Sequence, residues 1–192
     1  MRWVRRVTIA ATLIALAMLN SHSVLRAGED GEREGRLRSL RANLVGFEEP
    51  PSISTTGSGE FRARISFDQT MFEYELRFQG LVGNVTQSHI HIGQRGVSGG
   101  ISIWLCGTAS NPGPAGTPSC GGPHAGVVAG VVTAANVIGP AGQGIAAGEF
   151  AEVLAAMRAG AAYANVHSTL YPGGEIRGQI RVRDDDGDGD HD

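Results

Sequence analysis

Two histidines two positions apart give the first indication of chemistry in this sequence. His89 and His91 stand in the run Ser-His-Ile-His-Ile, where polar and apolar residues alternate. Residues two apart in a β-strand project from the same face, so both imidazoles would lie side by side while Ile90 and Ile92 face the other way. Neighbouring imidazoles can chelate a divalent metal ion. The alternative is a pair of polar histidines that only hydrogen-bond a nearby turn.

A second polar group lies near the C-terminal end. Asn165 and His167 alternate with Val166, so they are expected on one face of a strand. A turn is indicated at 172–174, where the sequence is Pro-Gly-Gly. A polar stripe follows this turn: Glu175, Arg177 and Gln179. Two interpretations of the stripe stay open, because it can bridge to neighbouring elements or form a plain solvated face.

The only two cysteines, Cys106 and Cys120, flank a segment rich in Gly and Pro. In an oxidising compartment they would form a disulfide that closes this loop. The alternatives are two free buried thiols or a two-cysteine metal site, although the spacing lacks a CxxC motif. His124 follows in the same region, and it either adds a further imidazole to the first group or is an ordinary exposed loop residue.

The N-terminal residues 1–27 are typical of a cleaved signal peptide. Three arginines precede an apolar run from Val7 to Leu19, and a polar stretch follows. This run is too short to span a bilayer, which takes roughly 20 apolar residues. Cleavage is expected after Ser23 or Ala27; the alternatives are an uncleaved amphipathic anchor or a buried helix. No later segment is apolar enough to span a membrane, so we expect a secreted or periplasmic protein.

The rest of the chain divides into three parts. Residues 28–36 are charged and contain glycine, and they are expected to form a flexible lead-in. Residues 37–183 are expected to form one β domain. Residues 184–192 are almost all Asp and Gly, which predicts a disordered acidic tail. Its aspartate spacing resembles the start of a calcium loop but lacks the Glu at position twelve.

Alternating patterns predict a series of short strands in the β domain. The clearest pattern places Phe61, Ala63, Ile65 and Phe67 on one buried face, followed by a turn at 68–70 and a strand at 72–78. The expected strands are 37–47, 60–67, 72–78, 86–92, 100–105, 126–133, 162–167 and 175–182. One helix is expected at 149–159. This set favours an all-β antiparallel sandwich or barrel with one short helix.

Several classes of function find no support in the sequence. The formal net charge of −3 gives no basic field for nucleic acid. Phosphate-binding loops and cofactor fingerprints are absent from the sequence. Ser168 follows His167 directly and would project from the opposite face, which argues against a Ser–His dyad. A binding role is therefore favoured over catalysis.

Three segments of the sequence resemble the CHRD domain, which is named after a repeated module of chordin. They are Leu44–Pro51, the His89-Ile90-His91 triplet, and the run from Ala162 to Gln179 that includes Asn165, Glu175 and Arg177. The resemblance extends over about residues 37–183. It implies an immunoglobulin-like Greek-key sandwich or barrel and no established catalytic activity. We expect the domain to bind a partner, which is an extracellular protein, a cell-envelope component or a metal ion.

A fainter resemblance connects the chain with copper/zinc superoxide dismutase. It rests on the HxH strand, the Gly-Pro-His at 122–124, and a later Val-His. It implies copper ligands at His89, His91, His124 and His167, with Arg177 beside them. The residues that would complete a zinc site are missing from the sequence. A simpler site formed by His89, His91 and His167, with an open coordination position, would suit copper or zinc.

Overall fold

The computed structural model describes residues 39–182 of the chain. The expected signal peptide, lead-in and acidic tail lie outside these residues. The described part belongs to one compact unit. None of its helices is long and apolar enough to cross a membrane.

The described residues form nine strands, one α-helix and three short 3₁₀-helices. The strands are β1 (Ser39–Val45), β2 (Ser58–Ile65), β3 (Met71–Gln79), β4 (Val85–Ile92), β5 (Gly100–Gly107), β6 (Gly126–Thr133), β7 (Ala162–Ser168), β8 (Ile176–Gln179) and β9 (Arg181–Val182). The helices are α2 (Phe150–Arg158), η1 (Gly46–Glu48), η2 (Ala134–Asn136) and η3 (Ala141–Gln143).

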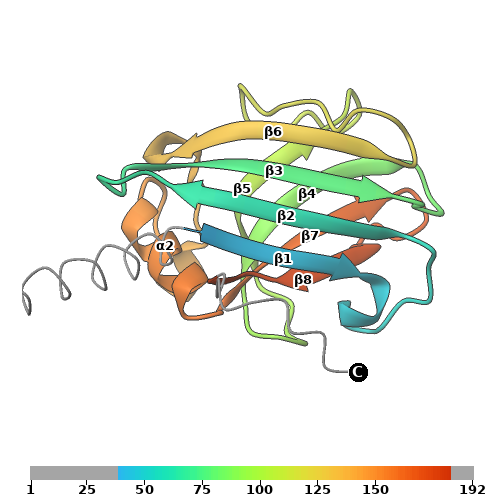
Figure 1. Ribbon diagram of the computed structural model, residues 1–192, viewed down its shortest axis with the longest axis horizontal. Coiled ribbons are helices and arrows are strands. Elements are labelled where there is room, and N and C mark those ends of the chain that lie inside the picture. Colours follow the sequence, from blue (N-terminus) through green and yellow to red (C-terminus); the bar gives the residue numbers. More distant parts are fainter. Residues whose placement is uncertain (1–38, 183–192) are drawn as a thin grey trace, which may run out of the picture. The chain divides into compact units, whose positions relative to one another are not determined.

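The strands join one antiparallel sheet in the order β5-β4-β7-β8-β1-β2-β3-β6, and β9 pairs with β1. Figure 1 shows β1, β2, β3 and β6 in one layer, with β4, β5, β7 and β8 crossing behind it. The sheet therefore curls into a nearly closed barrel around a single core. The predicted fold class, an antiparallel sandwich or barrel with one short helix, is confirmed.

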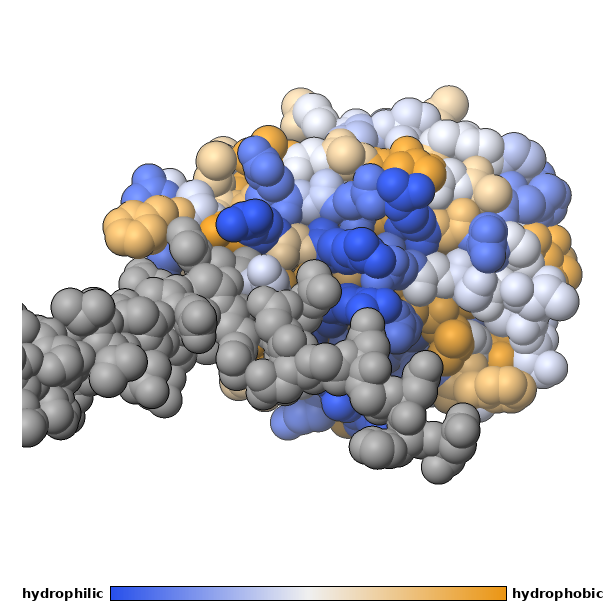
Figure 2. Space-filling view, in the orientation of Figure 1, coloured by the Kyte–Doolittle hydropathy of each residue, from blue (hydrophilic) through white to orange (hydrophobic). Residues whose placement is uncertain are grey.

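The β2–β3 hairpin follows the predicted alternation. Phe61, Phe72 and Leu76 are fully buried between the layers. On the outer face, Arg62 lies opposite Glu75 in the register. Arg62 forms its ion pair with Glu60 of its own strand at 2.8 Å, and further ion pairs join β1 to β2 and two residues within β3. Figure 2 shows hydrophilic residues gathered over this layer.

The prediction that Phe67 faces the core is wrong. β2 ends at Ile65, and the side chain of Phe67 is 73% exposed. The hydroxyl of Ser66 donates to Asp68 at 2.6 Å and thereby begins a turn. Alternation of faces holds only while a strand stays extended, so it stops at this turn.

The helix predicted at 149–159 forms α2, and it packs against β7 and β9. Its apolar residues recur at helical spacing, and all four are buried: Phe150, Val153, Leu154 and Met157. The ring of Phe150 stacks on Phe72 of β3, with 5.8 Å between centroids. Gly160 follows the helix with φ of +67°, a conformation that glycine adopts without steric cost.

The disulfide between Cys106 and Cys120 is present, as expected, and both residues are fully buried. It joins the end of β5 to the chain that leads into β6, with the two Cα atoms 4.9 Å apart. The backbone N–H of Cys120 also donates to the carbonyl of Gly107 at 2.9 Å. The intervening loop is thus closed at its base by a covalent bond and by backbone hydrogen bonds.

We predict that the double substitution Cys106→Ala/Cys120→Ala lowers the free energy of unfolding by about 3 kcal/mol, because the open loop gains entropy in the unfolded chain. Guanidinium unfolding followed by circular dichroism measures this. Dithiothreitol should lower the stability of the unsubstituted protein by a similar amount and leave the double variant unchanged. Equal midpoints for the two oxidised proteins would contradict the prediction.

Candidate metal centre

Strands β4 and β7 bring three histidines together on one face of the sheet. Each of His89, His91 and His167 offers one nitrogen, and these three atoms all lie within 4.8 Å of one another. The apolar residues between them, such as Ile90 and Val166, are fully buried in the core on the opposite face. The alternation that the sequence suggested therefore places the imidazoles outside the barrel wall and in a single group.

The three imidazoles are buried although they point away from the core. Their exposed fractions are 0% for His89, 7% for His91 and 6% for His167. The segment 93–99 and the turn at 171–174 provide part of the cover, because both contact these histidines through backbone carbonyls. The histidine group is thus buried between a sheet face and the loops that cover it, and we call this buried place the chamber.

Two backbone carbonyls fix the protonation of two of the rings. Nδ1 of His91 donates to the carbonyl of Gly99, and Nδ1 of His167 donates to the carbonyl of Pro172, both at 2.9 Å. A carbonyl only accepts hydrogen bonds, so each neutral ring carries its proton on Nδ1 and presents a lone pair on Nε2. Metal-ligating histidines are oriented in this same way in proteins.

The group contains more lone pairs than donors. Nδ1 of His89 lies 3.1 Å from Nε2 of His167, and Oδ1 of Asn165 lies 3.1 Å from that same Nε2. The Nε2 atoms of His89 and His91 are buried without a hydrogen-bond partner. A buried acceptor that lacks a partner costs about 1–3 kcal/mol. Such a set of converging, unsatisfied nitrogens would be stabilised by a cation.

The rings are held neutral, which is the form that binds metal. Burial lowers the pKa of His89 to about 2, and the neighbouring His167 and His91 act in the same direction. Burial also lowers the pKa of His91 to about 4 and lowers the pKa of His167. All three imidazoles are therefore free of protons on one nitrogen at neutral pH.

Two aromatic side chains form walls of the chamber. Trp104 of β5 meets His89 edge to face, with 4.3 Å between ring centroids. Tyr163 of β7 stacks on His91 at 4.9 Å. Gly113, in the disulfide-closed loop, lies against the indole so closely that a Cβ there would stand 2.6 Å from it. The disulfide loop therefore packs on the outer side of Trp104.

The polar stripe that follows the Pro-Gly-Gly turn bridges to neighbouring elements, which decides between its two interpretations. Arg177 donates to the carbonyls of Gln94 and Val97, and its guanidinium lies 3.5 Å from the centre of the Tyr163 ring. The two N–H groups of Gln179 Nε2 are shared among the carbonyls of three residues in two segments, each within 2.9 Å: Gly93, Gly160 and Ala162. These side chains hold the covering loops against the sheet.

Glu175 forms the third tie and is fully buried. Its carboxylate accepts hydrogen bonds from the hydroxyl of Thr55 at 2.6 Å and from the backbone N–H groups of Val82 and Gly83. Burial alone would raise the pKa of this carboxyl, but hydrogen bonds from hydroxyls and backbone N–H groups outweigh it and hold the pKa below its usual value. Glu175 thus positions segments and is not a member of the histidine group.

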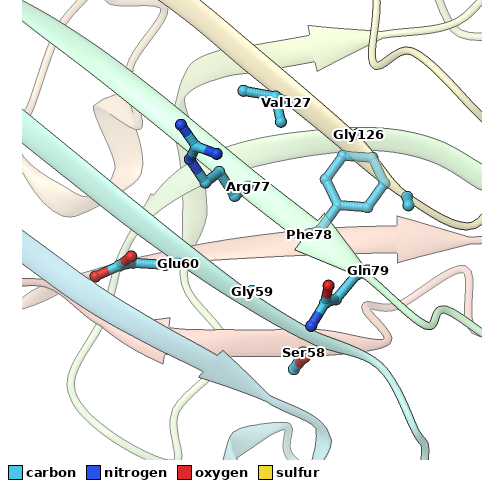
Figure 3. A pocket seen from close by; sticks show the side chains of 9 residues that line it. Ser58, Gly59, Glu60, Arg77, Phe78, Gln79, Gly126 and Val127 are labelled. Atoms are coloured by element: carbon cyan, nitrogen blue, oxygen red, sulfur yellow. The ribbon is translucent and has the colours of Figure 1, made fainter.

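His124 does not belong to the group that the other three histidines form in the described part of the chain. It is exposed, and its Nδ1 donates to the carbonyl of Leu81 at 2.9 Å. A surface hollow on the β2, β3 and β6 side, shown in Figure 3, has none of these histidines among its lining residues. Its charged lining residues are Glu60 and Arg77.

Several contributors to the site could not be found from sequence patterns. The carbonyls of Gly99 and Pro172 carry no side-chain signal. Trp104 lies on an apolar strand whose sequence gives no sign of its contact with His89. Glu49 lies in the segment Leu44–Pro51, whose sequence gives no sign that this residue is a buried carboxyl with an unpartnered Oε1. Its proximity to Gly174 and the charge of Arg177 comes from the tertiary structure.

A comparison with models of known protein families tests the family relationship that these motifs suggest. The sequence model of the CHRD domain matches residues 40–180, which include all three histidines and the three ties. The chain belongs to the CHRD-domain family. No curated protein and no solved structure gives a significant match to it. The CHRD domain is thus seen here as a nearly closed antiparallel barrel with a buried histidine group on its wall.

We predict that Glu49→Gln stabilises this CHRD domain above neutral pH. Burial raises the pKa of Glu49 to about 7, although the charge of Arg177 opposes the shift. A raised pKa gives stability that is complete below about pH 4.5 and is lost as the pH rises through 7. The variant should therefore exceed the unsubstituted protein by about 3 kcal/mol at pH 8 and match it near pH 4.5.

Denaturant unfolding at pH 4.5, 6 and 8 measures this difference. Glu73→Gln is the matched control, because Glu73 is an exposed carboxyl of β3. The control should keep the pH dependence of the unsubstituted protein. A pH-independent difference between Glu49→Gln and that protein would show that Glu49 ionises normally.

Proposed function

We propose that this CHRD domain binds one transition-metal ion, copper or zinc, through His89, His91 and His167. The observation that carries the proposal is the buried convergence of three neutral imidazoles, two of which have an Nε2 atom without a partner. Imidazole nitrogen is a preferred ligand of both metals.

The distances in the group suit a single ion after small adjustments. Ligand nitrogens lie at about 2.0–2.1 Å from zinc, so two of them on one ion are at most about 4.1 Å apart. Nδ1 of His89 and Nε2 of His167 lie 3.1 Å apart, which is within this limit. Binding of the ion through Nδ1 of His89 requires that the proton of this ring lies on Nε2. The widest separation, up to 4.8 Å, calls for a side-chain shift of less than an ångström. The carbonyls of Gly99 and Pro172 would orient two of the rings toward the ion.

Export is part of the same proposal. The disulfide supports an oxidising location, because such bonds persist in extracellular and periplasmic proteins. We therefore propose a secreted or periplasmic metal-binding module. The expected partner, an extracellular protein or a cell-envelope component, stays a prediction from the sequence. Catalysis, including the dismutase activity that the fainter resemblance implied, is not part of this proposal.

The experiment is metal analysis and titration of the purified protein beside matched histidine variants. We expect about one copper or zinc ion per chain, and a metal affinity at least about a hundredfold lower in His89→Ala/His91→Ala. His124→Ala removes a histidine outside the group and should bind like the unsubstituted protein. Bound metal should also raise the melting temperature of the unsubstituted protein and of His124→Ala.

Circular dichroism establishes that each variant is folded before its affinity is compared. If the double variant does not fold, the single variant His91→Gln serves, because its amide can still donate to the carbonyl of Gly99. Equal metal binding by the folded variant and the unsubstituted protein would refute the proposal, as would a failure of the unsubstituted protein to bind either metal.

A further inference from the structure

The ligands of the histidine group supply no negative charge. Within residues 39–182, the set of side chains that could hold an ion at this place consists of three histidines, without a carboxylate or a thiolate. Both cysteines are engaged in the disulfide. Neutral imidazoles leave the full charge of a bound ion in place, so the surroundings decide which ionic charge the site tolerates.

Those surroundings are dry. The three imidazoles are between 0% and 7% exposed, and aromatic rings of Trp104 and Tyr163 pack on two of them. An ion in this chamber gives up most of its hydration. The cost of transferring an ion out of water grows with the square of its charge, so it is about four times larger for a doubly charged ion than for a singly charged one.

The fixed charge that acts on His91 is positive. Arg177 is 1% exposed, and its guanidinium stacks on Tyr163, whose other neighbour in the sheet is His91. It donates to backbone carbonyls of 94 and 97, which neutralise none of its charge. The carboxyl that faces it, Glu49, is itself buried and only partly ionised at neutral pH. Arg177 therefore repels a bound cation, and it repels a divalent one twice as strongly.

The number of ligands that each ion requires also favours a singly charged copper ion. Zinc in proteins is almost always four-coordinate and takes a water as its fourth ligand where the protein supplies three, and Cu²⁺ prefers four ligands in a tetragonal arrangement. A site shielded from water favours an ion that needs only the three protein ligands. Cu⁺ has a filled d shell and accepts three nitrogens in a plane. The chamber offers three nitrogens, and the further donor atom beside them is the neutral amide oxygen of Asn165, a weak ligand for these metals.

We propose that the histidine group binds copper as Cu⁺, in preference to Cu²⁺ and Zn²⁺. This proposal rests on the proposed metal-binding function and makes it more specific. The site is shielded from water, has a positive neighbour and offers three nitrogens, and these three properties favour a singly charged, three-coordinate ion. The CHRD domain would then hold or carry reduced copper outside the cytoplasm.

Anaerobic competition titrations test the preference with the metals themselves. Bathocuproine disulfonate competes for Cu⁺, nitrilotriacetate for Cu²⁺, and 4-(2-pyridylazo)resorcinol for Zn²⁺. We expect Cu⁺ to bind at least about a hundredfold more tightly than either divalent ion. X-ray absorption of the Cu⁺ form should show three nitrogen neighbours. Equal or tighter binding of Zn²⁺ or Cu²⁺, or a fourth ligand on Cu⁺, would overturn this proposal and leave the general metal site standing.

Arg177→Gln tests the electrostatic part, because glutamine keeps amide donors for the covering loop and removes the charge. Its preference for Cu⁺ over Cu²⁺ should fall by about tenfold or more. Arg181→Gln removes an exposed arginine of β9 and should leave the preference unchanged. An unchanged preference in folded Arg177→Gln would overturn the role given to Arg177. If this variant does not fold, the titrations of the unsubstituted protein alone decide whether the site prefers Cu⁺. Binding of no ion at all would instead refute the proposed function itself.

Discussion

The histidine group depends on the register in which β4 pairs with β7. His89 lies opposite Asn165 and His91 lies opposite Tyr163, so all four side chains share the outer face of the barrel wall. The inner face of the same pair carries Ile90 and the apolar residues of β7, which the core requires. A shift of one residue would exchange the faces and place imidazoles in the core. Because the apolar side chains of β4 and β7 are buried in the core, the imidazoles must lie on the outer face of the sheet.

An outer sheet face normally contacts water, and here polar ties keep it covered. Glu175, Arg177 and Gln179 alternate along the strand that follows the Pro-Gly-Gly turn, and each is engaged with backbone groups of distant segments. Because backbone carbonyls and N–H groups must be satisfied once buried, loops can lie over the sheet only if such partners are supplied. These three residues of the family motif therefore have a structural role: they hold loops over the sheet and so shield the histidines from water.

The chamber carries an energetic cost that a bound ion would offset. Unpartnered nitrogens of His89 and His91, the buried guanidinium of Arg177 and the buried carboxyl of Glu49 lie in one small region. Each of these groups would be better solvated in the unfolded chain. Regions in which buried polar groups lack partners lower the stability of the fold, and they are often functional sites. A bound ligand supplies the partners that these groups lack.

Local patterns in the sequence were sufficient for the strands, the helix α2 and the shared face of His89 and His91, since side-chain direction follows from the period of each element. His167 joined them only through the resemblance to known families, because its approach to β4 depends on strand pairing. The disulfide followed from the cysteine count and the expected export. The sequence could not show that the histidine face is buried, that His124 stays apart, that Phe67 leaves the core, or that Gly99 and Pro172 orient two rings. Those features depend on where loops far apart in the sequence come to lie, and only the packing of the closed barrel decides that.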